Sequence, residues 1–150
     1  MNPARVASVT MVLGLLVACK PLEAGSYTVV LDQIVSNECT HVTEEDLGLD
    51  VPIAVEVSWD GDTLVLSGFG PEPDCEWDGD MGFTNEWTET MEVADPCYLG
   101  SDFEQDGTIT SSTSFEVDGS ITQYPDGDCS SAPVDVITCT IEVGYTGTKD

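Results

Sequence analysis

The feature that most restricts the fold is an alternation of apolar and polar residues. Between residues 51 and 59, Val, Ile, Val, Val and Trp occupy every second position, and a similar pattern runs from 137 to 145. A period of two predicts half-buried β-strands, whereas an amphipathic helix would give a period near 3.6. We expect about eight strands, at residues 26–36, 51–59, 63–69, 76–83, 86–94, 108–117, 120–125 and 136–146.

Asp-Gly pairs punctuate the chain at 60–61, 78–79, 106–107, 118–119 and 126–127. They favour tight hairpin turns, because such turns need residues that accept positive φ angles. A two-residue turn at Asp60-Gly61 would place Val57 opposite Leu64, whereas pairing around Asp118-Gly119 favours a three-residue loop. Short strands joined by tight turns predict an all-β fold, a single antiparallel meander that forms a barrel or a sandwich.

One short helix is expected in the long connection 37–50. Thr43 and Asp46 have the spacing of a capping box, two glutamates lie between them, and Gly48 is suited to end the helix. The segment has room for a single helical turn.

The first 25 residues carry a different pattern. After Arg5, residues 6–18 form a run of 13 uncharged and mostly apolar residues. This length is short for a transmembrane helix and typical of a signal peptide. The run ends in Leu16-Val17-Ala18-Cys19, which resembles the lipobox of bacterial lipoproteins.

The lipobox resemblance implies cleavage before Cys19 and acylation of its thiol, which would attach the chain to a membrane through acyl chains. Residue 20 is Lys and not Asp, which for such lipoproteins implies sorting to the outer membrane. We therefore divide the chain into a signal peptide (1–18), a lipidated tether (19–25) and an acidic β domain (26–150).

Five cysteines follow Cys19, and in an oxidising compartment they are expected to form two disulfides with one thiol left over. The candidate bridges are Cys75–Cys97 and Cys129–Cys139, with Cys39 free. Cys39–Cys139 is the alternative if the first and last strands are neighbours. The absence of CxxC pairs and the presence of one histidine argue against a zinc site.

The charge is strongly acidic, with 29 Asp and Glu against 3 Lys and Arg and a formal net charge of −26. Nucleic acid and anionic lipid headgroups are excluded as direct electrostatic partners, because both require basic side chains. Divalent or other cationic partners remain compatible with this charge. The chain is also 41% hydrophobic, which provides for a core.

The segment 74–80 resembles the start of an EF-hand calcium loop, with Asp74, Glu76, Asp78 and Asp80 at alternate positions and Gly79 before the last. It departs from that loop in having no flanking helices and Asn85 at the twelfth position. These four acids are the candidate calcium site. The alternative is that Asp-Gly turns in an acidic chain produce such strings without binding a metal.

Gly25-Ser26-Tyr27, at the start of the first strand, is similar to the Gly-x-Trp that opens lipocalin-like (calycin) barrels, with Tyr in place of Trp. This resemblance implies a carrier that holds a small apolar ligand inside the barrel. Six aromatic residues could line such a pocket: Trp59, Trp77, Trp87, Phe69, Phe83 and Phe103. Enclosed apolar space of roughly 300 Å³ or more would favour the carrier, and a filled interior a structural role.

Catalytic motifs are weak. His41 is the only histidine, and its neighbourhood with Cys39 matches no known nucleophile motif. Pairs of carboxylates are unavoidable among 29 acids, so they do not indicate a hydrolase. We therefore expect a non-catalytic, lipid-anchored envelope protein with a structural or binding role.

Overall fold

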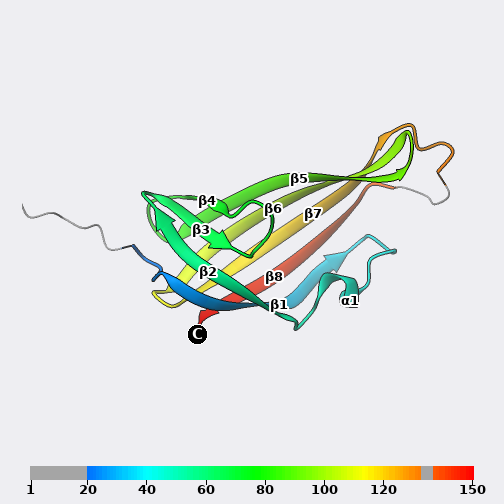
Figure 1. Cartoon of the computed structure of the whole chain (residues 1–150). Helices are drawn as coiled ribbons and strands as arrows, with labels where there is room; N and C mark the ends of the chain where they lie inside the picture. The colour runs from blue at the N-terminus through cyan, green and yellow to red at the C-terminus, as the bar shows by residue number, and fades with distance from the viewer. Residues whose placement is uncertain (1–19, 133–136) are drawn as a thin grey trace, which may run out of the picture.

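The computed structural model describes residues 20–132 and 137–150, and these form a β-barrel (Figure 1). Eight antiparallel strands pair in sequence order, and the first also pairs with the last, so the ring is closed. The strands are β1 (Gly25–Asn37), β2 (Pro52–Asp60), β3 (Thr63–Ser67), β4 (Asp74–Trp77), β5 (Gly82–Ala94), β6 (Cys97–Ser111), β7 (Ser114–Gly127) and β8 (Cys139–Lys149). The expected all-β meander is confirmed, in its barrel form.

The strands differ greatly in length. β2, β3 and β4 have 9, 5 and 4 residues, whereas β5, β6 and β7 have 13, 15 and 14. The short strands complete the ring at one end of the molecule, and the long ones continue past them into a projecting sheet (Figure 1). We call the end with the turns at 61–62, 78–81 and 112–113 the closed half. The open half is the opposite part of the molecule, past those ends of β2, β3 and β4 that lie away from these turns.

The closed half is filled by a hydrophobic core. Its largest side chains are Tyr27, Phe83 and Phe115, each at most 2% exposed, and their rings pack in a chain with centroids 5.8 and 5.9 Å apart. Aliphatic side chains from β1, β2, β3, β6 and β7 and from Leu22 extend the cluster, which also includes Phe69 and Cys75. This is the expected outcome for an eight-stranded barrel, whose interior is just wide enough to be filled by its own side chains.

Residues 20–24 lie across the closed half, and Leu22 among them belongs to its core. Leu22 is 1% exposed, and its carbonyl accepts a hydrogen bond from Trp59 Nε1 at 2.9 Å. Lys20 Nζ lies 2.6 Å from an Asp62 carboxylate oxygen and over the rings of Trp59 and Trp77. Residues 20–25, which the sequence assigned to the tether, are therefore packed on the barrel. The predicted signal peptide and Cys19 lie outside the described residues.

Both disulfides lie in the open half, and they correct the sequence prediction. Cys39 is bonded to Cys139 and Cys97 to Cys129, while Cys75 is a free, buried thiol. The predicted bridges Cys75–Cys97 and Cys129–Cys139 are wrong, and Cys39 is not free. The alternative Cys39–Cys139 is present because β1 and β8 are neighbours in the closed ring.

The predicted single-turn helix is confirmed as α1 (Glu44–Leu47), with a capping box between Thr43 and Asp46 and Gly48 in the left-handed conformation at its end. Its loop packs on β1 and β8, where Leu47 and Leu49 join a second cluster built around Leu31 and Ile141. No helix in the described ranges is long and apolar enough to cross a membrane.

Two of the predicted turns are wrong. Asp106-Gly107 and Asp118-Gly119 lie inside β6 and β7, which instead turn at 112–113. Residues 97–107 of β6 are therefore in a strand that the sequence did not predict, and the predicted strand 108–117 is interrupted by the turn. Gly107 is needed in the strand because the ring of Phe83 lies against it and leaves no room for a β-carbon. At this position glycine is required for packing against a neighbouring ring, and it does not form a turn.

The predicted β2–β3 hairpin exists, but its register is displaced by two residues. The turn is Gly61-Asp62, with Gly61 at φ +59°, so Trp59 pairs with Leu64 and Val57 with Leu66. Val57 and Leu64 are both buried, as the alternation predicts. The face assignment is therefore right and the pairing wrong.

Candidate functional site

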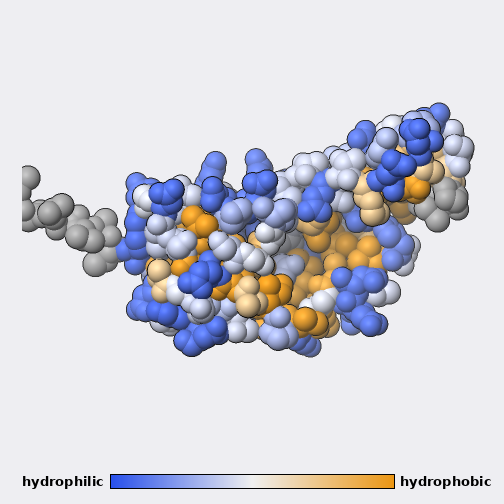
Figure 2. Space-filling view, viewed as in Figure 1, coloured by the Kyte–Doolittle hydropathy of each residue, from blue (hydrophilic) through white to orange (hydrophobic). Residues whose placement is uncertain are grey.

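A cavity of about 150 Å³ lies inside the open half, where the short strands end. Figure 2 shows this region as a hollow with an apolar floor between the barrel body and the projecting end. Its lining comes from β2, the β3–β4 connection and β5–β8: Ile53, Gly68, Phe69, Gly70, Trp87, Phe103, Glu104, Gln105, Gly119, Ser120, Ile121, Val143 and Tyr145. The volume is below the roughly 300 Å³ expected of a calycin-like carrier of a small apolar ligand, so it limits any occupant to a molecule smaller than such carriers hold.

The cavity exists because glycines stand on both of its walls. On the sheet side, Gly119 lies between Gln105 and Val143 in one row of inward-facing residues and contributes no side chain. On the other side, Gly68 and Gly70, both at φ +96°, bend the β3–β4 connection over the hollow. A β-carbon at Gly70 would come within 3.1 Å of the Trp87 ring, so this wall rests directly on that tryptophan.

Aromatic rings form much of the remaining wall. The rings of Trp87 and Phe103 are stacked, with centroids 4.8 Å apart and planes 5° from parallel. Phe69 and Tyr145 meet edge to face at 5.0 Å. Burial raises the pKa of the Tyr145 hydroxyl further above its ordinary value, and this lining residue is neutral at physiological pH. The cavity is therefore suited to a flat, uncharged group.

Two buried polar atoms in the cavity lining have no hydrogen-bond partner among the described residues, Trp87 Nε1 and Gln105 Oε1. Gln105 is 8% exposed, one of two buried polar residues in the described chain. Such atoms are rare in folded proteins, since burial removes their bonds to water. They mark the cavity as the strongest candidate binding site.

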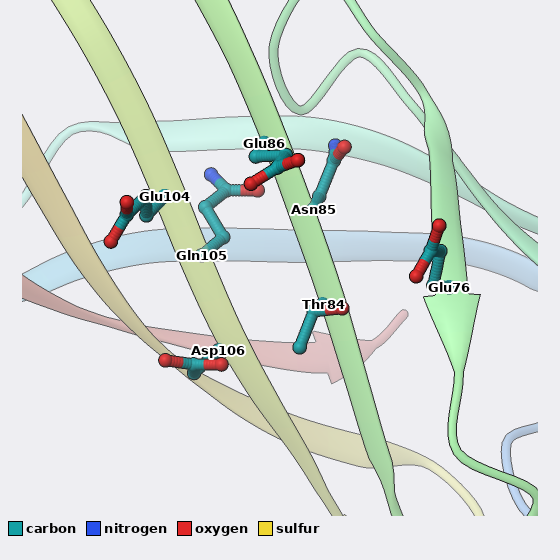
Figure 3. Close-up of a pocket in the computed structure, with 7 residues that line it drawn as sticks. All are labelled: Glu76, Thr84, Asn85, Glu86, Glu104, Gln105 and Asp106. Carbon is teal, nitrogen blue, oxygen red and sulfur yellow. The ribbon is translucent and has the colours of Figure 1, made fainter.

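An acidic groove of about 520 Å³ lies on the outer side of the same strands, along the seam between β4 and β5 (Figure 3). β4 and β5 form two residue pairs, Glu76 with Thr84 and Trp77 with Phe83, so the seam is short. The carboxylates that line the groove are Glu76, Glu86, Glu104 and Asp106. Glu86 and Glu104 stand directly opposite each other on β5 and β6.

The structure does not bring the four acids of the predicted calcium site together as a set of metal ligands. Within the described residues, no three His, Cys, Asp or Glu side chains are arranged to hold a metal ion. Asp74 and Glu76 lie on the extended strand β4, and not on the turning loop that the EF-hand pattern requires. Asp78 is held by its own turn, where Oδ1 accepts from the backbone N–H groups of Asp80 and Gly82.

Three exposed carboxyl groups have lowered pKa values, each through hydrogen bonds. Lys149 donates to Glu23, the Thr43 backbone and hydroxyl donate to Asp46, and Ser130 donates to Asp128. A hydrolase acid would instead need a raised pKa. The strongest raised value is that of the Cys75 thiol, at about 12, because of burial and then the charge of Asp74.

His41 lies exposed in the loop before α1, and its Nε2 is 3.0 Å from Gln123 Oε1. Of the six aromatic residues expected to line a pocket, Phe69, Trp87 and Phe103 do so. Phe83 belongs to the core, while Trp59 and Trp77 are half-buried and meet edge to face at the closed half. Trp87 is half-buried at the cavity.

Sequence reasoning missed Gln105 as a site residue. Its signal was a polar residue at an inward position of a strand, between Phe103 and Gly107. Because the Asp106-Gly107 pair predicts a turn, the sequence places Gln105 outside any strand. Its inward position therefore cannot be recognised from the sequence. Comparison of the chain with protein-family models, with curated proteins and with solved structures finds no match.

Proposed function

We propose that the mature chain is a non-catalytic binding protein of the bacterial cell envelope, anchored through acyl chains on Cys19, which holds a small and largely apolar molecule in the cavity of its open half. The observation that carries the binding role is the cavity itself, which combines stacked aromatic walls with two unpaired buried polar atoms. Apolar pockets with a few convergent polar groups are the usual form of small-molecule sites.

The envelope location is supported by two features. The run that ends in Leu16-Val17-Ala18-Cys19 is similar to a lipobox. The two disulfides of the described chain are typical of proteins that fold in oxidising compartments. Lys20 lies at the closed half, so an anchor at Cys19 would leave the cavity in the half that is farther from the lipid (Figure 1).

A purely structural role is the competing proposal, and the filled closed half favours it. The cavity favours binding, because a structural barrel gains nothing from an apolar hollow that it leaves unfilled. The volume of about 150 Å³ restricts the occupant to a small molecule and does not favour a carrier of long acyl chains.

Native mass spectrometry of the processed chain, isolated from the membrane of the cells that produce it, tests the binding role. We expect a non-covalent adduct that is released on denaturation. Ile53→Trp should fill the cavity that Ile53 lines and abolish the adduct, whereas Val51→Trp, at a residue 55% exposed and two positions away, should retain it. No adduct in the wild type, or an adduct that persists in folded Ile53→Trp, would contradict the proposal.

The anchor is tested separately. Cys19→Ser should leave an unprocessed precursor that still contains residues 1–18, because the acylated thiol is required before cleavage. The mass of the purified chain measures this directly, and a mutant cleaved at the normal position would contradict acylation at Cys19.

A further inference from the structure

The two unpaired atoms of the cavity are chemically complementary. Trp87 Nε1 carries a hydrogen and can donate but not accept, whereas Gln105 Oε1 can accept but not donate. A hydrocarbon in the cavity would leave both without a partner. An occupant that satisfies them must offer one acceptor and one donor.

The strand pairing makes Trp87 and Gln105 diagonal neighbours on β5 and β6. They lie on neighbouring strands and on the same inner face, with Trp87 directly opposite Phe103 and Gln105 two residues farther along β6. Such diagonal neighbours are about 7–8 Å apart at the backbone, within reach of each other for long side chains. A hydroxyl both accepts and donates, so one hydroxyl placed between the side chains can bond to both.

The size of the cavity and its walls define the rest of the occupant. An apolar cavity of about 150 Å³ accepts a molecule of about the size of benzene. The stacked pair Trp87–Phe103 and the Phe69–Tyr145 pair present ring faces and edges, against which another ring packs favourably. One aromatic ring therefore fits better than a flexible chain of equal volume.

The charge of the surroundings excludes an anion. Glu104 is one of the lining residues, its exposed side chain stands opposite Glu86 on the outer face, and the chain as a whole carries a formal charge of −26. No Lys or Arg lines the cavity to offset these carboxylates. A carboxylate or phosphate ligand would be repelled on approach and left unpaired inside.

We infer that the cavity binds a neutral one-ring aromatic alcohol of the phenol type, whose hydroxyl accepts a hydrogen bond from Trp87 Nε1 and donates one to Gln105 Oε1. This inference rests on the proposed binding function and specifies the chemical class of its ligand.

Three one-ring probes of similar size separate the contributions: 4-methylphenol, toluene and 4-methylbenzoate. The processed chain in lipid nanodiscs is titrated with each probe and followed by the three tryptophan indole N–H signals in ¹H–¹⁵N spectra, with empty nanodiscs as the blank for partitioning. We expect 4-methylphenol to bind at least about tenfold more tightly than toluene, because it forms two more hydrogen bonds. It should shift the Trp87 signal alone, and 4-methylbenzoate should not bind.

Variants assign the preference to the two side chains. Trp87→Phe removes the donor and keeps a ring, and Gln105→Met removes the acceptor and keeps the length. Each should reduce the preference for 4-methylphenol over toluene at least about threefold, with toluene still bound. Trp77→Phe is the matched control, since the Trp77 indole donates to the Asp80 carbonyl outside the cavity, and it should leave the preference unchanged.

The outcomes distinguish this inference from the binding function. Toluene bound as tightly as 4-methylphenol, or a preference that survives both variants, would overturn the hydroxyl assignment and leave an apolar binding site. Binding of 4-methylbenzoate more tightly than 4-methylphenol would overturn the inference that the ligand is uncharged. Failure of all three probes while the native adduct is still lost in Ile53→Trp would reject the class and keep the function. Failure of both tests would remove the function as well.

Discussion

The closed and open halves of the barrel share strands β5–β8 but use their glycines in opposite ways. In the closed half, Gly107 faces the ring of Phe83 and Gly147 faces the ring of Phe115, so the space above each glycine is filled. In the open half, Gly119 has the smaller Val143 as its nearest neighbour, and a cavity remains. A glycine in a barrel strand thus admits a neighbouring ring or leaves a hollow, depending on the residue beside it.

The halves also differ in what holds them together. Packing stabilises the closed half, which holds most of a cluster of 13 buried residues that includes the free thiol of Cys75. The open half has a smaller cluster of five buried residues, and both disulfides lie there. We therefore expect reduction to affect mainly the open half, and loss of buried side chains to affect mainly the closed half.

The largest effect is expected from removing the bridge between β1 and β8. Cys39→Ala with Cys139→Ala opens a loop of 100 residues, which costs about 4.7 kcal/mol on the chain-entropy model. Removing Cys97–Cys129, with a separation of 32, should cost less. Urea denaturation measures both. Equal stability of the wild type and the Cys39/Cys139 double variant would show that packing alone holds the open half.

The next effect concerns packing in the closed half. Leu22→Ala removes a side chain that is 1% exposed and should lower the free energy of unfolding by about 3 kcal/mol. Ile121→Ala, at a half-buried residue that already lines the cavity, should cost roughly 1 kcal/mol, since less burial is lost. Similar losses at the two positions would remove the distinction between a filled and an unfilled half.

The free thiol gives a pH test of the closed half. Burial raises the pKa of Cys75 from 9.0 to about 12, so above pH 9 the unfolded chain ionises this thiol and the folded chain does not. The free energy of unfolding therefore keeps its full value below pH 9. It falls as pH rises towards 12, by about 1.4 kcal/mol at pH 10. Denaturation at pH 7 and pH 10 measures the loss, and Cys75→Ala should reduce it. An unchanged slope in that variant would mean that the thiol is not the group responsible.

The smallest effect is expected on the outer face of the open half. Glu86 and Glu104 stand opposite each other, and like charges in that position repel. Glu104→Gln should therefore stabilise the fold by about 0.5 kcal/mol at low salt, and the gain should shrink in 0.5 M NaCl because of screening. Glu72→Gln, at an exposed loop residue, is the control for a general loss of charge. Equal gains in both variants would assign the effect to net charge.

The sequence predicted much of the fold and only part of the site, because sequence patterns report mainly on residues that are near neighbours along the chain. Alternation identified β1, β2 and β3, and the capping pattern at Thr43 identified α1, because both signals depend on near neighbours. Asp-Gly at 106–107 and 118–119 was misleading, because these glycines lie in strands and make room for rings and side chains on other strands. Such contacts depend on the closed ring and leave no local pattern.

The site residues divide in the same way. Trp87 and Phe103 were identified by their aromatic character, which suits a pocket lining whatever the register. Gln105 could not be found without the full length of β6, and the pairing of Cys39 with Cys139 could not be chosen without knowing that the ring closes. The calcium pattern at 74–80 does not form an EF-hand loop, because residues 74–77 form β4 and residues 78–81 form a tight turn.

The length of β6 sets how far the molecule reaches. Its 15 residues span about 50 Å, or roughly 40 Å along the barrel axis at a typical strand tilt. The described chain begins and ends at the closed half, where the Asp150 backbone N–H donates to Ser26, and the β5–β6 turn lies at the far tip (Figure 1). If Cys19 is acylated, this tip stands four or more screening lengths from the lipid at physiological salt. The surface charge of that membrane would be fully screened at the tip. The tip would therefore be placed to contact partners on the side away from the membrane.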